Sequence, residues 1–292
     1  MMNTDFLFRI IEKTVNYGFV RYMMYSNGTL VHKYEDMMKR DFMKSLVNRF
    51  EVQLSYDGEP HNTIKRRTNK ETIFKVADLL IANGVHVSFK ATLSMDSLSL
   101  LPQIWDSYKE LYDRYDFVHY SPTIDQTDKD NTDENFKIWK DVLKKVAIKE
   151  IDFIKKHGRP LWVWFECPGK LACDINNSIH MHCDGNLYLC HGCQYQTNCD
   201  KFIVGKTSDV SNLEASLIRG FHPTVRHVEC VNCSAVVCSI CHVGELSKHP
   251  SLIEDCRSNW TKIMVNNPNR CRFFKYFAKV YYATTIAIME KR

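Results

Sequence analysis

The spacing of apolar residues in the first half of the chain switches repeatedly between helical and strand-like. Phe6, Ile10 and Val15 fall on one side of a helix predicted over residues 4–17. Residues 50–56 alternate apolar and polar side chains, as a half-buried strand does. The same reading predicts further helices at 33–47, between Thr68 and Asn83, at 102–113 and at 133–157, and further strands at 19–25, 85–93 and 116–121. Such alternation is typical of a parallel sheet with helices outside it.

Local start and stop signals support the predicted helices. Thr68 and Glu71 form a capping box at the start of the third helix, because each side chain can accept a hydrogen bond from a backbone N–H that has no partner within the helix. Asn83 and Gly84 close the same helix. Gly158 stops the long helix over residues 133–157.

The strand count sets the expected fold class. The pattern starts with a helix and contains four such strands before residue 160, which is enough for a curved half-barrel and too few for a closed one. A helix-first start indicates that a preceding strand is missing or comes from elsewhere. We expect residues 1–160 to form an α/β partial (β/α) barrel, and we place a domain boundary near residue 160.

After residue 160 the chain changes character. Residues 167–260 are rich in Cys, His, Asn and Gly. Only short strand-like pieces occur there, and a helix is predicted near residues 270–288. The short pieces are 180–183, 186–189 and 201–204. We expect residues 161–292 to form a small cysteine-rich domain of hairpins and loops.

Composition narrows the function classes. The net charge is +5 over 292 residues, and the basic residues are spread out, so nucleic acid is not an expected partner. No apolar run is long enough to cross a bilayer. The N-terminus lacks a basic leader, an apolar stretch of signal length and a cleavage site. These features predict a cytoplasmic protein that is not bound to a membrane.

The twelve cysteines are the strongest chemical signal. All of them lie between Cys167 and Cys271, and without a signal peptide such clustering favours metal binding over disulfides. One group is Cys167-x5-Cys173 followed by Cys190, and the other, at residues 230–241, reads CVNCSAVVCSIC. A Cys-x2-Cys pair aims two sulfurs at one point, and thiolates select zinc or iron–sulfur clusters. Spacing alone leaves zinc and iron–sulfur equally open.

The order of these motifs resembles the SPASM domain. Cys173-x11-Gly185-x4-Cys190 is followed by Gly205, by the group at 230–241, and by Cys271 before an aromatic helix. In the family this module carries auxiliary clusters and is attached to radical S-adenosylmethionine (AdoMet) enzymes that modify peptides and proteins. The family's second cysteine group is slightly longer than the one in this chain.

Two upstream elements resemble the barrel of the same enzymes. Residues 26–29, Ser-Asn-Gly-Thr, are similar to the family's Thr-Asn-Gly-Thr strand end. Ser55 begins a Ser-x-Asp-Gly element, which His61 and Arg66 follow as they do in the family. The resemblance implies that Ser55 contacts AdoMet, that Arg66 is a looser candidate and that Asn27 lies near the same rim.

The resemblance also implies ligands for two auxiliary 4Fe-4S clusters. One cluster would be bound by Cys167, Cys173, Cys190 and Cys241, and the other by Cys230, Cys233, Cys238 and Cys271. Cys256 is the alternative to Cys271 as the last ligand. The implied partner is a peptide or protein substrate. After Cys190 the chain has His191, where sulfatase-maturing members have an aspartate, and this departure argues against that particular activity.

The family's catalytic cluster site has no counterpart in this sequence. Its Cys-x3-Cys-x2-Cys motif and its Gly-Gly-Glu stretch do not occur, and no cysteine precedes Cys167. One hypothesis is therefore a truncated or split radical AdoMet enzyme, completed by a separate N-terminal fragment without which it could not use AdoMet. A second is a non-catalytic protein that binds iron–sulfur clusters or peptides. A third is a zinc-stabilised structural protein.

Overall fold

The computed structural model describes ten ranges of the chain and two single residues. They are 4–14, 21–61, 69–115, 122–125, 128–165, 179–188, 190–208, 224–227, 262–265 and 268–290, with residues 247 and 251. The chain divides into two compact units. Unit 1 consists of Met1–Glu166 with Val280–Arg292, and unit 2 consists of Cys167–Lys279.

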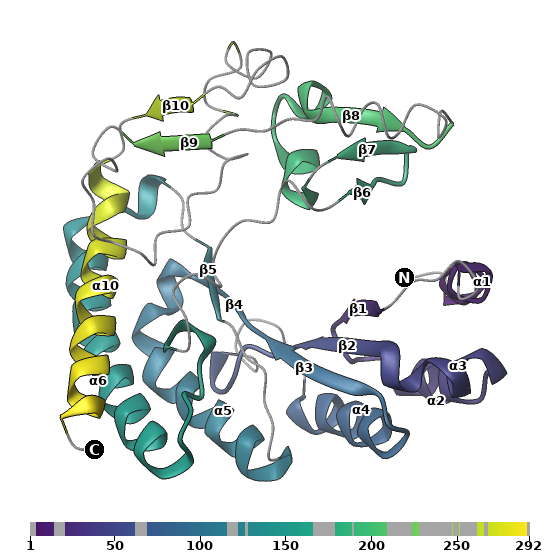
Figure 1. Ribbon diagram of the computed structural model, residues 1–292, viewed down its shortest axis with the longest axis horizontal. Helices are drawn as coiled ribbons and strands as arrows, with labels where there is room; N and C mark the ends of the chain where they lie inside the picture. The colour runs from purple at the N-terminus through teal and green to yellow at the C-terminus, as the bar shows by residue number, and fades with distance from the viewer. Residues whose placement is uncertain are drawn as a thin grey trace. The chain divides into compact units, whose positions relative to one another are not determined.

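Unit 1 is built on parallel strands. β1 (Tyr22–Ser26), β2 (Phe50–Ser55) and β3 (His86–Lys90) form a three-stranded parallel sheet in that order (Figure 1). β4 (Thr92–Ser94) follows β3 after one residue and pairs in parallel with β5 (Thr123–Asp125). The expected parallel α/β architecture is therefore confirmed for the described part of unit 1.

Helices connect these strands. Figure 1 shows α2, α3 and α4 on one side of the sheet β1–β3. The α-helices of unit 1 are α1 (Thr4–Thr14), α2 (Val31–Met38), α3 (Asp41–Leu46), α4 (Lys70–Ala82), α5 (Leu101–Tyr115) and α6 (Asp133–His157). Shorter 3-10 turns are η2 (Val47–Arg49), η4 (Met95–Leu100), η5 (Asp128–Asp130) and η6 (Val163–Phe165).

Several sequence expectations need correction or lie outside the described residues. The strand expected at 85–93 is two strands, β3 and β4, with Ala91 between them, and they belong to different sheets. The helix expected at 33–47 is two helices, α2 and α3, which meet at the extended residue Arg40 (φ −74°, ψ 133°). The cap of α4 is Asn69, whose side chain accepts a hydrogen bond from the Glu71 backbone, and Thr68 lies outside the described part. The strand expected at 116–121 also lies outside it. Gly158 closes α6 in the left-handed region (φ 73°), as predicted.

The apolar core of unit 1 lies between the sheet and the helices. Val52 and Leu54 are fully buried on β2. Tyr56 is also fully buried, and its ring contacts Phe74 of α4 and Phe89 of β3. Burying such large side chains supplies most of the favourable free energy of a small α/β unit.

A buried carboxylate fixes the segment that follows α6. Glu150 is fully buried and accepts hydrogen bonds from the Trp105 indole (2.8 Å), the Leu161 backbone (2.9 Å) and the Trp162 backbone (2.9 Å). Burial raises the pKa of Glu150 to about 7, although the three donors pull in the opposite direction. Glu150 thus joins α5, α6 and residues 161–162 within unit 1.

Unit 2 has short strands and few regular elements. β6 (His180–Met181), β7 (Asn186–Tyr188) and β8 (Ile203–Lys206) form an antiparallel sheet. β9 (Thr224–His227) and β10 (Lys262–Val265) pair in parallel. The 3-10 turns η8 (His191–Tyr195) and η9 (Cys199–Phe202) lie between β7 and β8. A turn at Asp184-Gly185 joins β6 and β7, with Gly185 at φ 83°.

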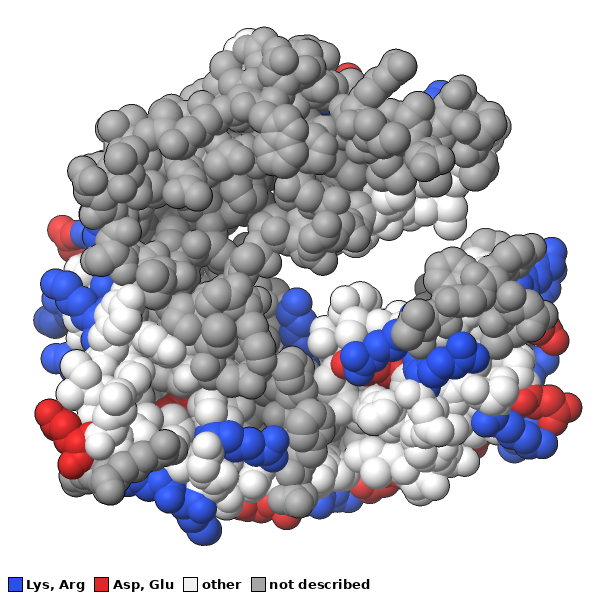
Figure 2. Space-filling view, viewed as in Figure 1, with Lys and Arg blue, Asp and Glu red and all other residues white. Residues whose placement is uncertain are grey.

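The last helix belongs to both units. α10 (Pro268–Met289) begins in unit 2, and from Val280 onward it is part of unit 1. None of the helices described is long and apolar enough to cross a membrane. On the face shown in Figure 2, Lys and Arg side chains are interspersed with Asp and Glu over unit 1.

Candidate functional site

The sheet β1–β3 has an apolar face and a polar face. In parallel strands, paired residues point to the same side and neighbours along a strand point to opposite sides. The pairs Met24 with Val52 and Leu54 with Phe89 therefore share the apolar face, where all four side chains are buried. The opposite face carries Met23, Tyr25, Glu51, Gln53, Ser55, His86, Ser88 and Lys90. A polar, partly exposed sheet face can bind a polar ligand.

The centre of this polar face is held by its own hydrogen bonds. Glu51 is 7% exposed and accepts from the Ser88 hydroxyl (2.7 Å) and from the Arg21 guanidinium (2.7 Å). Gln53 donates to the Ser88 hydroxyl at 3.4 Å. A buried carboxylate needs such partners to stay charged. The Glu51 carboxylate therefore has its hydrogen-bond and ion-pair partners within the protein.

The carboxyl ends of the three strands bring Asn27, Ser55 and Lys90 into one row. Ser26 pairs with Leu54, so Asn27 lies beside Ser55, and Ser55 pairs directly with Lys90. Asn27 and Ser55 are the two predicted AdoMet-site residues that the structure describes, and it brings them together. In open α/β sheets, ligands bind outside the carboxyl ends of the strands. Lys90 is an addition to the predicted set.

The turn after β1 uses the side chain of Asn27. Its amide oxygen accepts from the Thr29 backbone (3.2 Å) and from the Thr29 hydroxyl (2.9 Å). Gly28 adopts φ 68°, and its backbone donates to the Ser26 hydroxyl at 3.3 Å. Asn27 therefore shapes the rim of the site through an Asx turn.

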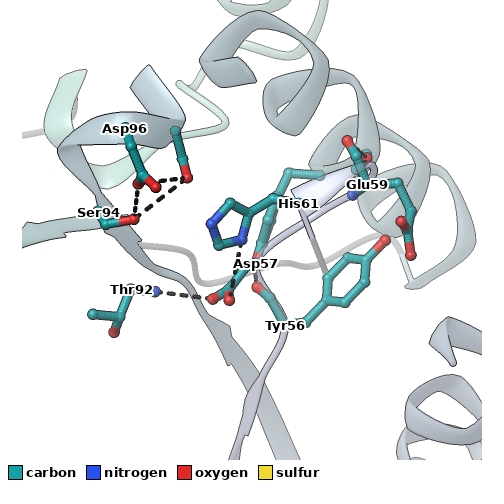
Figure 3. A network of polar contacts seen from close by, with 10 residues as sticks. Tyr56, Asp57, Glu59, His61, Thr92, Ser94 and Asp96 are labelled. Carbon is teal, nitrogen blue, oxygen red and sulfur yellow. Dashed lines mark hydrogen bonds and ion pairs between the residues drawn. The ribbon is translucent and has the colours of Figure 1, made fainter. Parts of the chain in front are cut away.

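A buried carboxylate–imidazole pair lies beneath the loop after β2. Asp57 Oδ2 is 3.4 Å from His61 Nδ1, and the Asp57 and His61 side chains are 1% and 4% exposed (Figure 3). Asp57 Oδ1 accepts from the Thr92 backbone at 3.0 Å, which ties this loop to β4. The pair thus fixes the segment that begins at Ser55. His61 is close to Asp57, in keeping with the Ser-x-Asp-Gly…His pattern of the sequence.

The end of β4 contributes a second polar group beside this pair. Ser94 donates to Asp96, and the Ser97 hydroxyl also donates to Asp96 at 3.3 Å. Figure 3 shows the His61 ring between Asp57 and the Ser94–Asp96 pair. Both segments follow the carboxyl ends of strands of unit 1, so polar groups gather on this side of the unit.

In unit 2, Cys190 begins the 3-10 turn η8. Its sulfur accepts a hydrogen bond from the Gly192 backbone at 3.3 Å. Backbone N–H groups directed at a sulfur favour the thiolate, which is the form that binds metal. The local geometry of Cys190 therefore fits a ligand role.

Two further cysteines, Cys193 and Cys199, lie near the hairpin formed by β6 and β7. Cys193 is 1% exposed and lies three residues after Cys190. Burial raises the pKa of Tyr188, and the nearby Cys199 and Cys193 act in the same direction. The sequence analysis did not single out Cys193, although its Cys-x2-Cys spacing from Cys190 was the available signal.

Most of the predicted metal ligands lie outside the described residues. Cys190 and Cys271 are described, and both are partly exposed. Cys167, Cys173, Cys230, Cys233, Cys238, Cys241 and the alternative Cys256 are not described, and neither is Arg66. Within the described ranges, no three His, Cys, Asp or Glu side chains are grouped so that they could hold a metal ion.

No family model matches this chain, and no curated protein matches it.

Structure comparison, in contrast, finds solved structures that match almost the whole chain. They are structures of anSMEcpe, an anaerobic sulfatase-maturating radical AdoMet enzyme. Native anSMEcpe with bound AdoMet and Kp18Cys peptide has a TM-score of 0.60 and 16% identity, and the match covers 99% of this chain and 82% of that one. Native anSMEcpe with bound AdoMet and Cp18Cys peptide has a TM-score of 0.59 and 16% identity, and the match covers 98% of this chain and 82% of that one. Native anSMEcpe with bound AdoMet alone has a TM-score of 0.60 and 16% identity, and the match covers 98% of this chain and 81% of that one. The chain therefore has a fold of the radical AdoMet type.

Proposed function

We propose that this chain binds auxiliary iron–sulfur clusters and acts in the radical modification of a peptide or protein. The observation that carries the proposal is a fold of the radical AdoMet type over 99% of a chain whose twelve cysteines all lie in residues 167–271. The solved structures of that fold hold AdoMet and peptides. At 16% identity their chemistry reaches this chain only as a proposal.

The cluster ligands come from unit 2. They are Cys167, Cys173, Cys190 and Cys241 for one cluster and Cys230, Cys233, Cys238 and Cys271 for the other. The hydrogen bond from Gly192 to Cys190 supports this set, because it stabilises the sulfur as a thiolate. Such bonds also tune the potential of a cluster.

The polar face of unit 1 is the proposed site for AdoMet and substrate. Ser55, Asn27 and Lys90 line the carboxyl ends of the strands, and Arg66 follows the same loop. AdoMet, when bound to a reduced cluster with an open iron, supplies a carbon radical that removes hydrogen from a substrate. The Cys-x3-Cys-x2-Cys motif for that cluster does not occur in this sequence, and we propose that residues outside it, such as a separate N-terminal fragment, supply that cluster.

Metal analysis under anaerobic conditions tests the cluster proposal. Protein purified without oxygen is expected to be brown and to contain iron and acid-labile sulfide in equal amounts, with up to about eight of each per chain by the two-cluster assignment. The Cys230→Ser variant should lose about half of the iron, whereas Cys183→Ser, at an exposed cysteine, should leave the content unchanged. Colourless protein with stoichiometric zinc would refute the proposal.

A non-catalytic scaffold that binds iron–sulfur or zinc is the second candidate. The observation that favours it is the absence of any cysteine before Cys167. Reduction of the anaerobic protein with AdoMet, alone and together with a polypeptide that carries Cys-x3-Cys-x2-Cys, separates the two candidates. Release of 5′-deoxyadenosine only in the mixture supports the split enzyme. No release from any candidate partner encoded beside this chain supports the scaffold.

A further inference from the structure

Three consecutive residues at the tip of the β6–β7 hairpin have reactive side chains that the proposed function does not use. They are His182, Cys183 and Asp184, and they lie between the end of β6 and the turn at Gly185. Cys183 is exposed, and the His182 and Asp184 side chains are 37% and 47% exposed. Cys183 is not among the proposed cluster ligands, so cluster binding does not consume its thiol.

Hydrogen bonds across the hairpin hold these residues in place. The His182 backbone donates to the Asn186 carbonyl at 2.9 Å, and the Gly185 backbone donates to the His182 carbonyl at 3.0 Å. The Asp184 carboxylate accepts from the backbone and from the side-chain amide of Asn186, at 2.8 and 2.9 Å. The Asn186 backbone N–H holds the pKa of Asp184 below its usual value, so this carboxylate is charged at neutral pH.

The three side chains are arranged as a nucleophile, a base and an orienting carboxylate. Asp184 Oδ1 lies 3.1 Å from His182 Nδ1. Cys183 Sγ lies 3.7 Å from His182 Nε2 and 3.9 Å from His182 Nδ1. A carboxylate at Nδ1 favours the tautomer with its proton there, which leaves Nε2 to accept the proton of the thiol. The imidazolium that results stays beside the thiolate and favours it by opposite charge.

Metal binding does not explain the same three groups. Cys, His and Asp are all possible metal ligands, but among the described residues no three such side chains are grouped so that they could hold a metal ion. The arrangement therefore fits nucleophilic chemistry at an exposed sulfur better than coordination.

We propose that Cys183 is a modification site that forms a mixed disulfide with low-molecular-weight disulfides, with His182 as its base and Asp184 as the residue that positions the base. The thiol proton moves to His182 Nε2, and the thiolate attacks one sulfur of the disulfide. A bond from Cys183 to that sulfur forms while the sulfur–sulfur bond of the reagent breaks, and the leaving thiolate takes the proton from His182. One disulfide replaces another, so no further oxidant or reductant is needed.

The rate of adduct formation on the full chain tests this site. Protein purified without oxygen is mixed with oxidised glutathione, and the initial rate at each cysteine is followed by peptide mapping and mass spectrometry. The adduct should form first on Cys183. The His182→Gln change should slow it about tenfold, and Asp184→Asn should slow it by a smaller factor because the imidazole remains.

A second exposed cysteine separates activation from mere exposure. Lys206 is exposed on β8, where it pairs with Asn186 of the same small sheet. In the Cys183→Ser protein, a Lys206→Cys change supplies a thiol on that sheet without the His182–Asp184 pair as its sequence neighbours. This thiol should react about tenfold more slowly than Cys183 does in the wild type.

Three outcomes would each overturn the proposal. The first is an adduct that forms earlier on another cysteine of the wild type. The second is a rate at Cys183 that the His182→Gln change leaves as it was. The third is a Lys206→Cys thiol that reacts as fast as Cys183, because exposure alone would then account for the reaction.

Discussion

Units 1 and 2 differ in the length of their regular elements and in the apolar burial of their described residues. Unit 1 has a parallel sheet, long helices and a continuous set of buried apolar side chains. In the described part of unit 2 the strands have two to four residues, and the buried hydrophobic residues are few. They are Leu187, Tyr188, Cys193, Phe202, Phe273, Phe277 and Ala278.

This difference leads us to expect a different main source of stability for each unit. Apolar burial of about 25 cal/mol per Å² accounts for a unit such as the first. A small unit with short strands needs another source, and bound metal is a common one. Four experiments test this difference between the units.

Removal of the metal should have the largest effect. We expect chelation or oxygen exposure to unfold unit 2 while unit 1 stays folded, because a metal bound only by the folded state adds on the order of 10 kcal/mol to a small domain. Hydrogen exchange followed by mass spectrometry should show loss of protection in β7 and β8 and none in α4 and α6. Loss of protection in both units together, or in neither, would contradict the comparison.

Gly58 should be the most sensitive glycine tested in unit 1. It adopts φ 79°, and an added Cβ would lie 3.0 Å from Ile104 Cγ2 and 3.2 Å from Ile104 Cα. The Gly58→Ala change should lower the free energy of unfolding of unit 1 by about 4 kcal/mol, because backbone strain and overpacking add. Urea denaturation measures this loss.

Gly158 is the matched control for that change. Its φ is 73°, and an added Cβ would meet nothing within 4 Å. The Gly158→Ala change should therefore cost only the strain, about 1 kcal/mol. Equal losses of unfolding free energy at the two positions would show that the Ile104 side chain moves to accommodate the added Cβ and that this part of the core is loosely packed.

The buried Glu150 should make unit 1 depend on pH. Its pKa is about 7 in the folded state and 4.5 in an exposed chain, so the folded protein holds the proton more tightly. The contribution of Glu150 to stability is then greatest below pH 4.5, falls as pH rises through about 7 and stays level above that. Between about pH 5 and 8 we expect a fall of about 2 kcal/mol.

The difference in unfolding free energy between the wild type and the Glu150→Gln variant isolates this group. That difference should decrease by about the same amount over the same pH range. The exposed Glu134, on the same helix, supplies the control variant Glu134→Gln. A difference that does not vary with pH would mean that the three donors around Glu150 outweigh its burial.

The smallest expected effect concerns the start of α4. Asn69 accepts from the Glu71 backbone at 2.8 Å. The Asn69→Ala change should cost about 1 kcal/mol, and Asn69→Asp should cost only a few tenths, because Asp keeps an acceptor. Thermal unfolding of the two variants measures the gap. If both variants unfold like the wild type, the local cap does not contribute to unit 1.

The fold of unit 1 could largely be predicted because its signals are local. The alternation in residues 50–56 and the Gly158 stop are visible in the sequence and are present in the structure. The break between α2 and α3 was missed because Tyr34, Met37, Met43 and Leu46 are buried on both sides of it, so the apolar pattern continues through the break. The sequence could not distinguish Asn69 from its neighbour Thr68 as the N-cap of α4, because both residue types are favoured at that position.

The candidate site was harder to predict because it depends on strand pairing. Asn27 and Ser55 were recognised as motif residues, but their proximity follows from the register of β1 and β2. Lys90 alternates with Val87 and Phe89 along β3, so its face was predictable from the strand pattern. That it lies next to Ser55 and, within the described ranges, lacks a carboxylate partner is a property of the assembled sheet, which no single segment encodes.

The division of α10 between the units has a consequence for synthesis of the protein. Unit 1 contains residues from both ends of the sequence, and unit 2 is inserted between them. On the ribosome, the segment that begins at Val280 emerges after all of unit 2, so the first unit to be translated is the last to be completed. Because α10 begins in that insertion, slow folding of the insertion would also delay the helix that completes the first unit.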